Sequence, residues 1–448
     1  QAGEAIEIGY AMGCANHKFL PPADALNSLQ GLDVEYYNSP DLSGEVVARE
    51  TKPGSEIMWF HDVAPGVHAK LFSARLRTRF TALESGTHQF SLVSAGVSRL
   101  FVDGQLVVDN WDGWQPGDSY FGSGSAEAIG TTELKAGQSY DLLVEYSART
   151  RGMFSARAIR IGAFRPLPDD AIERAAELAA GADAALVFVG LNGDWDTEGN
   201  DRPHMDLVGQ QDELIERVAA ANPSTVVVLQ TGGPVSMPWI DKVAGVLQAW
   251  YPGQECGNAI ADVLFGAVNP SGKLPQSFPV RLEDNPAFLN YPGENGVVTY
   301  GEGIFVGYRY YEKKKIAPLF PFGFGLSYTR FSYSNLRLSA ATIGPDEPLT
   351  VRVDVTNTGE RAGQEIVQLY VADKEARLAR PEKELKGFAK VALDPGQTAT
   401  VEIALDRRSL SYWDDARHDW VAEPGEFTVL VGGSSDAIQA SATLQLTT

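Results

Sequence analysis

Alternating apolar and polar residues dominate the chain from residue 31 to about residue 161. The alternation is seen in AKLFSARLRTRFTA, GTHQFSLVSAG, SRLFVDGQLVVDNW and QSYDLLVEYSAR, with Gly, Asp and Ser between these segments. A period of two places alternate side chains on opposite faces of a strand, and Asp-Gly at 103–104 is typical of a tight hairpin turn. We therefore expect an antiparallel β module, a sandwich or a barrel, over residues 31–164.

The pattern changes over residues 165–280, where apolar strands alternate with amphipathic helices. Three segments are strand-like, DAALVFVGLN, TVVVLQ and GVLQAW, and three have helical periodicity, PDDAIERAAELAAGA, GQQDELIERVAAAN and CGNAIADVLFG. This alternation favours a mainly parallel, doubly wound sheet, and an Asp before the first helix is expected to cap it. AIEIGYAMGC (5–14) is a further strand candidate, so residues 1–30 and 165–328 are expected to form one α/β domain that the β module interrupts.

Short alternating strands return in the last third of the chain, over residues 329–448. They include LTVRVDVTNTG, EIVQLYVAD, TATVEIAL and GEFTVLVGG, with turn residues between them. A series of short strands with such turns is typical of an immunoglobulin-like sandwich. The fold class predicted for the whole chain is therefore multidomain α/β plus all-β.

Composition narrows the classes of function. The formal net charge is −21 over 448 residues, which argues against nucleic-acid binding and is compatible with a neutral substrate such as a sugar. The two cysteines, Cys14 and Cys256, form no disulfide framework and are expected to be free and buried. No apolar run is long enough to span a bilayer. The first residues lack the features of a signal peptide, so the compartment stays open, with a secreted or periplasmic location favoured over the cytoplasm.

The acidic segment DWDTEGNDRPHMD (194–206) is the candidate for chemistry. It carries five carboxylates and directly follows an apolar strand, and ligands of doubly wound sheets bind at the carboxyl ends of the strands. The six scattered histidines have no zinc-ligand spacing, and no nucleophile elbow or phosphate loop occurs. A carboxyl acid or base remains, with neighbouring carboxylates to raise its pKa and Trp195 as an apolar wall. The alternative is an acidic surface loop that caps the next helix.

Ordered motifs along nearly the whole chain resemble the C-terminal portion of glycoside hydrolase family 3, the β-glucosidase type. The motifs are TEGNDR, WYPGQECGNAIADVLFGAVNPSGKLPQSFP, YGEGIFVGYRYYE and PLFPFGFGLSYTRF. VDVTNTGERAGQEIVQLYV and RPEKELKGFAKVALDPGQ resemble the fibronectin type III-like tail of that family. LDVEYYN and RLFVDGQLVVDNWDGW resemble a protective-antigen-type β module that some members carry inside the α/β domain.

The resemblance implies a retaining two-step hydrolysis of terminal β-glycosides, in which one residue acts first as acid and then as base. By its motif this residue is Glu198, whereas Asp201 and Arg202 are expected to brace the loop. Asp194 and Asp196 stay open as alternative donors. Gly253, Gln254, Glu255 and Glu302 recur in the matching motifs and are expected to be structural.

The family's nucleophile is an Asp on an N-terminal (β/α)₈ barrel, and nothing in this sequence matches it. We therefore expect the barrel on another chain or segment, packed against the Glu198 loop, and without it the chain should not hydrolyse glycosides. A homodimer of the full assembly is possible. The competing hypothesis is a non-catalytic carbohydrate-binding or adhesion protein built from the β modules.

Aromatic side chains of the β module could stack on a sugar on the leaving-group side. Trp59, Phe60, Trp111 and Trp114 are the candidates, and Trp111 and Trp114 are favoured because NWDGWQPGD is loop-like. The predicted substrate-binding set is therefore Trp111, Trp114 and Trp195. The acids of VDG (102–104) and VDN (108–110) are interpreted as hairpin turns, so no metal and no cofactor is expected.

Overall fold

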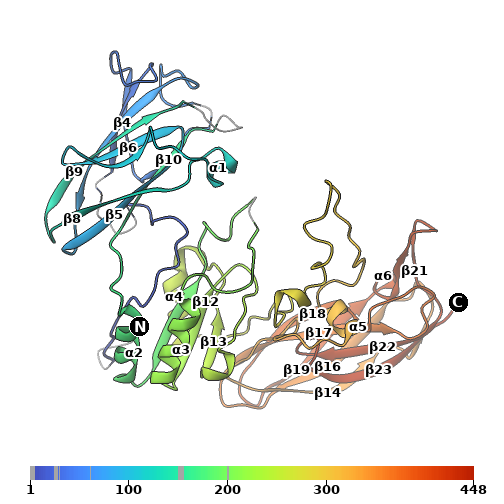
Figure 1. Ribbon diagram of the computed structural model, residues 1–448. Coiled ribbons are helices and arrows are strands. Elements are labelled where there is room, and N and C mark those ends of the chain that lie inside the picture. Colours follow the sequence, from blue (N-terminus) through green and yellow to red (C-terminus); the bar gives the residue numbers. More distant parts are fainter. Residues whose placement is uncertain (1–5, 25–28, 30, 61, 150–155, 199–200) are drawn as a thin grey trace.

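A computed structural model describes residues 6–24, 29, 31–60, 62–149, 156–198 and 201–448 of the chain. Figure 1 shows three parts: a β module (blue to cyan), an α/β domain (green) beneath it, and a C-terminal β-sandwich (orange to red) to one side. The predicted fold class is confirmed. Within these residues, none of the helices has the length and apolarity that crossing a membrane requires.

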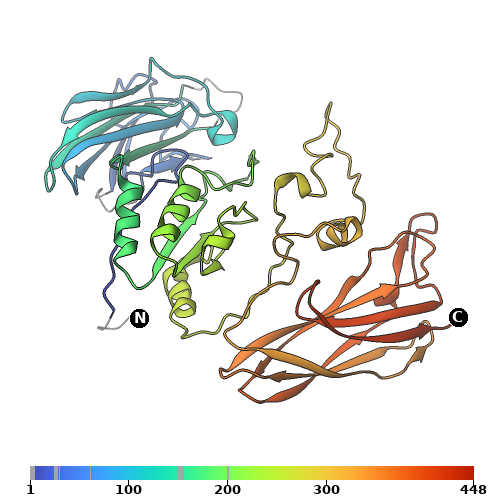
Figure 2. The same ribbon diagram turned by 60° about the horizontal axis from the view of Figure 1, so that its bottom comes forward.

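The β module consists of two antiparallel sheets that pack face to face (Figure 2). One sheet has the strand order β2-β1-β4-β9-β6-β7 and the other β3-β10-β5-β8. Alternate side chains of both sheets fill one core, as the period of two predicted. The elements are β1 (Leu32–Tyr37), β2 (Ala48–Lys52), β3 (Glu56–Met58), β4 (Ser73–Thr81), β5 (Gly86–Ala95), β6 (Val97–Val102), β7 (Gln105–Asn110), α1 (Ser119–Gly122), β8 (Ala128–Leu134), β9 (Ser139–Ser147) and β10 (Ala158–Phe164).

The acids singled out in this module form turns. Asp103 and Gly104 have positive φ angles of 47° and 77° between β6 and β7, which is the conformation of a tight hairpin. Asp109 is the second-last residue of β7, and its carboxylate accepts hydrogen bonds from the amides of Trp111 and Asp112, at 2.9 and 3.1 Å. Both aspartates thus have a local structural role.

The chain enters and leaves the β module through two segments that lie side by side. The amide of Ala23 donates to the carbonyl of Ile161 at 3.0 Å, and the amide of Ala163 donates to the carbonyl of Pro21 at 3.0 Å. The two ends of the module are therefore fastened to each other next to the α/β domain.

The α/β domain contains a parallel sheet of three described strands in the order β11-β12-β13. The apolar strands and amphipathic helices alternate as predicted, and their side chains form a core that includes Ile215, Val227 and Trp239. β11 is at one edge of these three, and its Leu186 and Phe188 are half exposed. The elements are α2 (Ala171–Ala180), β11 (Ala185–Gly190), α3 (Gln211–Ala221), β12 (Thr225–Gln230), η1 (Ile240–Lys242), β13 (Gly245–Gln248), η2 (Gly253–Glu255) and α4 (Cys256–Leu264).

The strand expected over residues 5–14 is not formed in its described part, residues 6–14. This segment instead lies against α2 and α3, with Gly9 and Gly13 at the contacts. A Cβ at Gly9 would lie 2.9 Å from a methyl carbon of Leu178, and one at Gly13 would lie 2.4 Å from a methyl carbon of Leu214. Alternation shows only that a segment has two unlike faces, whereas a strand also needs a neighbour for its backbone hydrogen bonds.

Two local expectations also differ. Asp170 stands at the N-cap of α2 but makes no capping hydrogen bond; its carboxylate pairs with Arg174 at 2.9 Å instead. Cys14 and Cys256 are free but only partly buried. Desolvation, supported by the charge of Glu213, still raises the pKa of Cys14 to about 11, so its thiol stays protonated near neutral pH.

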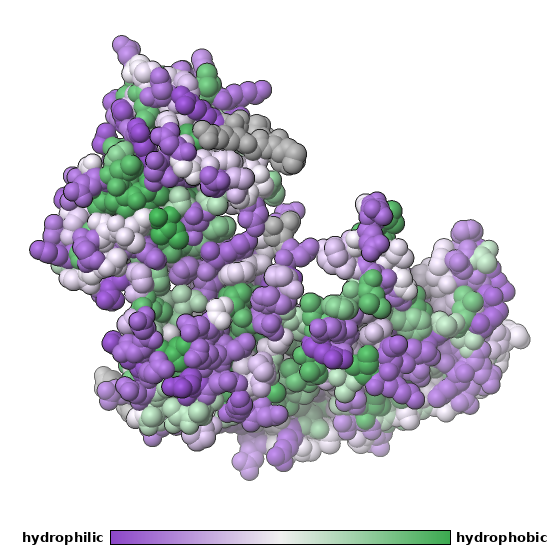
Figure 3. All heavy atoms as spheres, viewed as in Figure 1, coloured by the Kyte–Doolittle hydropathy of each residue, from purple (hydrophilic) through white to green (hydrophobic). Residues whose placement is uncertain are grey.

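Residues 282–306 form a projection between the α/β domain and the C-terminal sandwich, yellow in Figure 1. After η3 (Leu282–Asp284) the projection contains no helix or strand until α5 (Tyr308–Lys314). It stands across an open hollow from the β module (Figure 3). Eight of its large apolar side chains are exposed: Phe288, Leu289, Tyr291, Val297, Val298, Tyr300, Ile304 and Val306. We call these eight residues the apolar projection.

The C-terminal domain is the predicted sandwich, with sheets ordered β14-β16-β19 and β15-β23-β22-β17-β18. Its core is made by alternate residues of both sheets. The elements are β14 (Phe331–Leu338), β15 (Thr342–Ile343), β16 (Leu349–Asn357), β17 (Gly363–Asp373), β18 (Glu384–Leu393), β19 (Thr398–Leu405), α6 (Arg407–Leu410), β20 (Tyr412–Asp414), β21 (Asp419–Val421), β22 (Gly425–Gly432) and β23 (Ile438–Leu446).

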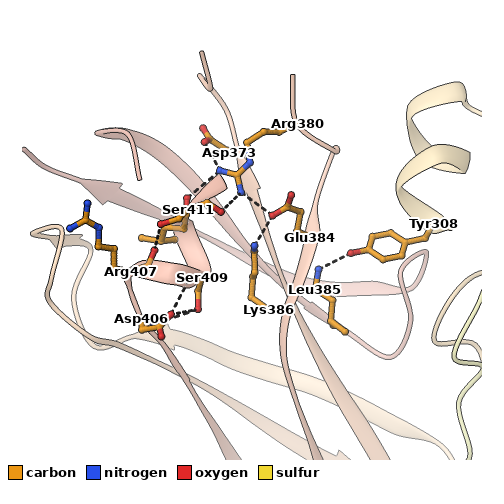
Figure 4. A network of polar contacts seen from close by, with 11 residues as sticks. Tyr308, Asp373, Arg380, Glu384, Leu385, Lys386, Asp406, Arg407, Ser409 and Ser411 are labelled. Atoms are coloured by element: carbon orange, nitrogen blue, oxygen red, sulfur yellow. Dashed lines mark hydrogen bonds and ion pairs between the residues drawn. The ribbon is translucent and has the colours of Figure 1, made fainter. Parts of the chain in front are cut away.

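A buried polar network, shown in Figure 4, holds the edge of this sandwich together. Arg380 donates to Asp373 and to Glu384, at 2.9 Å each, and Lys386 pairs with Glu384 at 2.6 Å. Next to it, the amide of Leu385 donates to the Tyr308 hydroxyl of α5 at 2.8 Å. Each of these charges has an opposite charge beside it, and the hydrogen bond between Leu385 and Tyr308 attaches α5 to the sandwich.

Candidate active site

The acidic loop begins where β11 ends, at the carboxyl edge of the parallel sheet, as the sequence predicted. Asn192 starts it with a tight turn: its carbonyl accepts from the amides of Trp195 and Asp196, both at 3.0 Å, and its side chain accepts from the amide of Asp194, also at 3.0 Å. The loop rises from the α/β domain towards the level of the β module (Figure 1). Residues 194–198 and 201–206 of the acidic segment are described, so Glu198 lies within the structure.

Asp194 is held by the β module. The Arg160 guanidinium of β10 donates to both carboxylate oxygens, at 2.6 and 3.1 Å. The side chains of Arg160 and Asp194 are 10% and 17% exposed, which makes this a shielded ion pair with two parallel hydrogen bonds. Asp194 is therefore engaged in a structural contact with the β module.

Asp196 is held by the α/β domain. Its carboxylate accepts from the amide of Gly232 at 3.0 Å and from the hydroxyl of Tyr251 at 2.6 Å, and it pairs with Arg202 at 3.2 Å. Burial, together with the hydrogen bond to Asp196, raises the pKa of Tyr251 well above its ordinary value, so its hydroxyl stays a donor. Arg202 also donates to the carbonyl of Pro234 at 3.1 Å.

Asp201 and Arg202 brace the loop as expected, but they do not pair with each other. Arg202 takes Asp196 as its partner, whereas Asp201 accepts a hydrogen bond from the hydroxyl of Tyr291 in the apolar projection. This hydrogen bond is the main reason that the pKa of Tyr291 is raised. The loop is thus connected to three other parts of the molecule through three different carboxylates.

Glu198 differs from the neighbouring carboxylates. Its side chain is exposed, and among the residues that the structure describes it has no hydrogen-bond or ion-pair partner. The loop on its N-terminal side is fixed by Asp194 and Asp196. The arrangement therefore presents one unengaged carboxyl on a held support, which suits proton transfer to a bound molecule.

The sequence reasoning missed Tyr251 and Tyr291, which bind two of these carboxylates. Both tyrosines precede Pro-Gly, in WYPG and NYPG, and both lie within or beside the motifs that carried the resemblance. The repeated Tyr-Pro-Gly was a signal that could have marked them. Their partners could not be named from the sequence because they are 55 and 90 residues away.

The three predicted substrate-binding tryptophans are partly buried. Trp195 donates its indole N–H to the carbonyl of Asn16 at 2.8 Å, and Trp114 donates to the carbonyl of Ser94 at 3.4 Å. The guanidinium of Arg99 lies 5.0 Å from the centre of the Trp111 ring. Trp111 and Trp114 lie together on the loop after β7, and within the described chain no hydrogen bond or ring contact links them to residues 194–198.

The remaining candidates of the sequence analysis have structural surroundings. Trp59 is only 4% exposed and packs in the core of the β module, whereas Phe60 is 69% exposed. Glu302 accepts from Asn290 at 2.8 Å within the projection, and Glu255 accepts from Asn258 at 2.6 Å at the start of α4. In the described part of the chain, no group of three or more His, Cys, Asp or Glu side chains is placed to hold a metal ion.

Two protein-family models match this chain. Residues 29–328 match the model of the glycosyl hydrolase family 3 C-terminal domain, and residues 365–435 match that of the fibronectin type III-like domain. A β-glucosidase of Rhizobium radiobacter is 46% identical over 99% of this chain, and a probable β-glucosidase I of Aspergillus clavatus is 45% identical over 97%. The chain spans about half of these relatives, 54% of the length of each.

Solved structures show the same similarity. The β-glucosidase of Kluyveromyces marxianus in complex with glucose is 40% identical, with a TM-score of 0.90 over 99% of this chain and 54% of that one. A β-glucosidase of Streptomyces venezuelae in complex with D-glucose is 32% identical, with a TM-score of 0.65 over 99% of this chain and 51% of that one. Because the family model matches more than half of the residues and the relatives match nearly all of them, this chain belongs to glycosyl hydrolase family 3.

Proposed function

We propose that this chain is the part of a retaining β-glucosidase that supplies the general acid/base, and that Glu198 is that residue. The observation that carries the proposal is the contrast within the loop: Asp194 and Asp196 are engaged in ion pairs, whereas the exposed carboxyl of Glu198 has no ion-pair partner among the residues that the structure describes. The names of the relatives support the β-glucoside as the substrate class.

The chemistry follows from a carboxyl that can give and take one proton. In the first step a carboxylate nucleophile attacks the anomeric carbon and forms the glycosyl-enzyme bond, while Glu198 protonates the glycosidic oxygen; the glycosidic bond breaks and the leaving group departs as an alcohol. In the second step the carboxylate of Glu198 removes a proton from water, which attacks the glycosyl-enzyme intermediate. Because the side chain of Glu198 is exposed, it can reach a sugar. The contacts of Asp194 and Asp196 limit the positions that its carboxyl can take.

The nucleophile must then come from elsewhere. The carboxyls of a retaining pair stand about 5–5.5 Å apart, and no segment of this sequence resembles the family's nucleophile motif. We infer that an N-terminal (β/α)₈ barrel, on the same or another polypeptide, carries that aspartate. The eight exposed side chains of the apolar projection support a docking surface for it, because contiguous exposed apolar residues mark interaction sites.

The tryptophans fit the leaving-group side of such a site. The indole N–H groups of Trp114 and Trp195 already bind backbone carbonyls, so their remaining contribution to a sugar is the apolar ring face. The guanidinium of Arg99 lies over the Trp111 ring, and the side chain of Trp111 is partly exposed. We infer that Trp111, Trp114 and Trp195 contribute apolar faces to the aglycone rather than hydrogen bonds.

The test is Glu198→Gln in the complete enzyme, barrel included. With an alkyl glucoside, whose leaving group needs a proton, kcat should fall by about 10²–10⁴-fold, the usual contribution of general acid–base catalysis. A nitrophenyl glucoside should be cleaved faster than the alkyl glucoside by this variant, and azide should restore turnover by replacing water. Asp206→Asn, which removes an exposed carboxylate of the same loop, is the control and should retain activity.

Wild-type rates for Glu198→Gln with both substrates would remove Glu198 from the mechanism. The acid/base would then be another residue. Sugar binding by the β module without catalysis would become the leading function only if the complete wild-type protein hydrolysed neither glucoside, and it would be measured by calorimetric titration of the chain with β-glucosides.

A further inference from the structure

Arg160 is the point at which the β module touches the acidic loop most directly. It lies on β10, the last strand of the module, and its side chain leaves the module to bind both oxygens of Asp194, 34 residues further along the chain. The pair is largely shielded from water, with side-chain exposures of 10% and 17%. Shielding matters here because exposed ion pairs contribute little to holding a conformation.

A second set of contacts surrounds this pair. Arg160 also donates to the carbonyl of Leu20 at 3.2 Å, and its guanidinium lies 5.7 Å from the centre of the Phe19 ring. The amide of Leu20 in turn donates to Glu127 at 2.7 Å, next to β8 of the module. Residues 16–20 therefore lie between the module and the acidic loop and contact both.

The loop itself contacts this segment from the other side. Trp195 donates to the carbonyl of Asn16 at 2.8 Å, and the amine of Lys18 lies 5.9 Å from the centre of the Trp195 ring. Asp194 and Trp195 are thus both positioned by contacts outside the α/β domain's own sheet. Asp196, by contrast, is positioned by Gly232, Tyr251 and Arg202 of the α/β domain.

We propose that Arg160 is a positioning residue for the acid/base: it makes the placement of Glu198 depend on the inserted β module. The proposal rests on the proposed function of Glu198. The module is then part of the support of the catalytic loop, in addition to any contact that it makes with the substrate. Removing Arg160 leaves the shielded carboxylate of Asp194 without its cation, and the loop must move to rehydrate it.

The first experiment measures steady-state kinetics of Arg160→Gln in the complete enzyme. The kcat for an alkyl glucoside should fall by about 10–100-fold, since a 1 Å displacement of a catalytic group can cost ~10²-fold, with KM changed by less than about threefold. Arg160→Lys keeps the charge but cannot form the two parallel hydrogen bonds, so it should recover only part of the loss. Arg75→Gln breaks an arginine–carboxylate ion pair inside the module, with Glu145 at 3.1 Å, away from the acidic loop, and is the control.

The second readout is amide hydrogen exchange of residues 191–198 in this chain, which does not depend on catalysis. Arg160→Gln should accelerate exchange in this peptide, whereas Arg75→Gln should not. Asp194→Asn should accelerate it as well, and the double variant should add little to either single one. Unchanged exchange over 191–198 together with a wild-type kcat in Arg160→Gln would overturn the proposal.

The two proposals fail differently. If Glu198→Gln keeps full activity, the assignment of the acid is wrong, but accelerated exchange in Arg160→Gln still shows that Arg160 holds the loop. If Arg160→Gln does not fold, Arg160→Lys provides both readouts, and a lysine variant with wild-type kcat and exchange would then overturn the positioning role.

Discussion

Three carboxylates near Glu198 have partners from three different parts of the molecule. Asp194 has an arginine of the β module, Asp196 has an arginine, a tyrosine and an amide of the α/β domain, and Asp201 has a tyrosine of the projection. These contacts explain why thirteen residues contain so many acids. Three of them attach the loop to other parts of the molecule, and a fourth, Glu198, remains exposed.

The residue types at this site could be predicted from the sequence, but their pairing could not. The acidic loop and its place after an apolar strand follow from local patterns, and the motif TEGNDR indicated Glu198. Asp201 and Arg202 were expected to brace the loop, but the sequence did not name their partners. The fold instead brings Arg202 to Asp196 and Arg160 to Asp194, and no local pattern encodes contacts between separate elements.

His17 gives a prediction of pH dependence at this scale. Its pKa is lowered from 6.5, first by burial and then by the charge of Arg160, although Glu127 and Asp194 act in the opposite direction. The folded chain therefore favours neutral His17, and stability should be fully present above pH 6.5 and decrease as the pH falls below that value. Urea unfolding at pH 7.5 and 5.5 should show this decrease.

The variant His17→Gln should lose part of that decrease, because its side chain does not titrate. His68→Gln, at an exposed position of the β module, should retain all of it. An identical pH dependence in wild type and His17→Gln would show that other groups control the acid sensitivity.

At the scale of elements, Gly190 is the last residue of β11 and stands directly before the acidic loop. A Cβ at Gly190 would lie 2.1 Å from the carbonyl oxygen of Gln230 in β12. The clash is with backbone, which cannot rotate away, so Gly190→Ala must separate the ends of two paired strands. We expect it to lower the free energy of unfolding by about 1–3 kcal/mol, the usual cost of overpacking, measured by denaturant unfolding.

Gly257→Ala in α4 is the matched control for this substitution. A Cβ at Gly257 meets no described atom within 4 Å, and Ala is favoured over Gly in a helix by about 0.5–1 kcal/mol. The control should therefore be neutral or stabilising. Equal effects of the two substitutions would contradict the steric argument for Gly190.

The elements themselves were predictable where a pattern sufficed to define them. The period of two gave the strands of both sandwiches, and the βα alternation gave a parallel sheet. The strand expected at AIEIGYAMGC failed because its pattern does not specify a partner, and the described residues 6–14 lie on helices instead. The Asp170 cap failed because Arg174 competes for the same carboxylate.

At the scale of the whole molecule, the apolar projection yields a prediction about assembly. Leu289 and Tyr300 are 92% and 81% exposed, and replacing both by Ser removes apolar area without disturbing a core. When the barrel is supplied as a separate polypeptide, this double variant should bind it at least about tenfold more weakly, which corresponds to about 1.4 kcal/mol. Titration followed by native mass spectrometry measures the change.

Phe388→Ser is the control for the projection, because Phe388 is also a large exposed side chain, 70% exposed, but lies on β18 of the sandwich. It should leave the affinity for the barrel unchanged. An unaffected affinity in the Leu289→Ser/Tyr300→Ser variant would place the docking surface elsewhere on the molecule.

The side-by-side ends of the β module have an evolutionary consequence. Since backbone hydrogen bonds of Ala23 and Ala163 hold the two connecting segments side by side, a single genetic deletion could remove the whole insertion and leave ends that a short turn can close. Arg160 would be lost in the same event, and Asp194 would keep its charge without a counterion. Descendants that discarded the module are therefore expected to have replaced Asp194 as well, so that two distant positions changed together in their history.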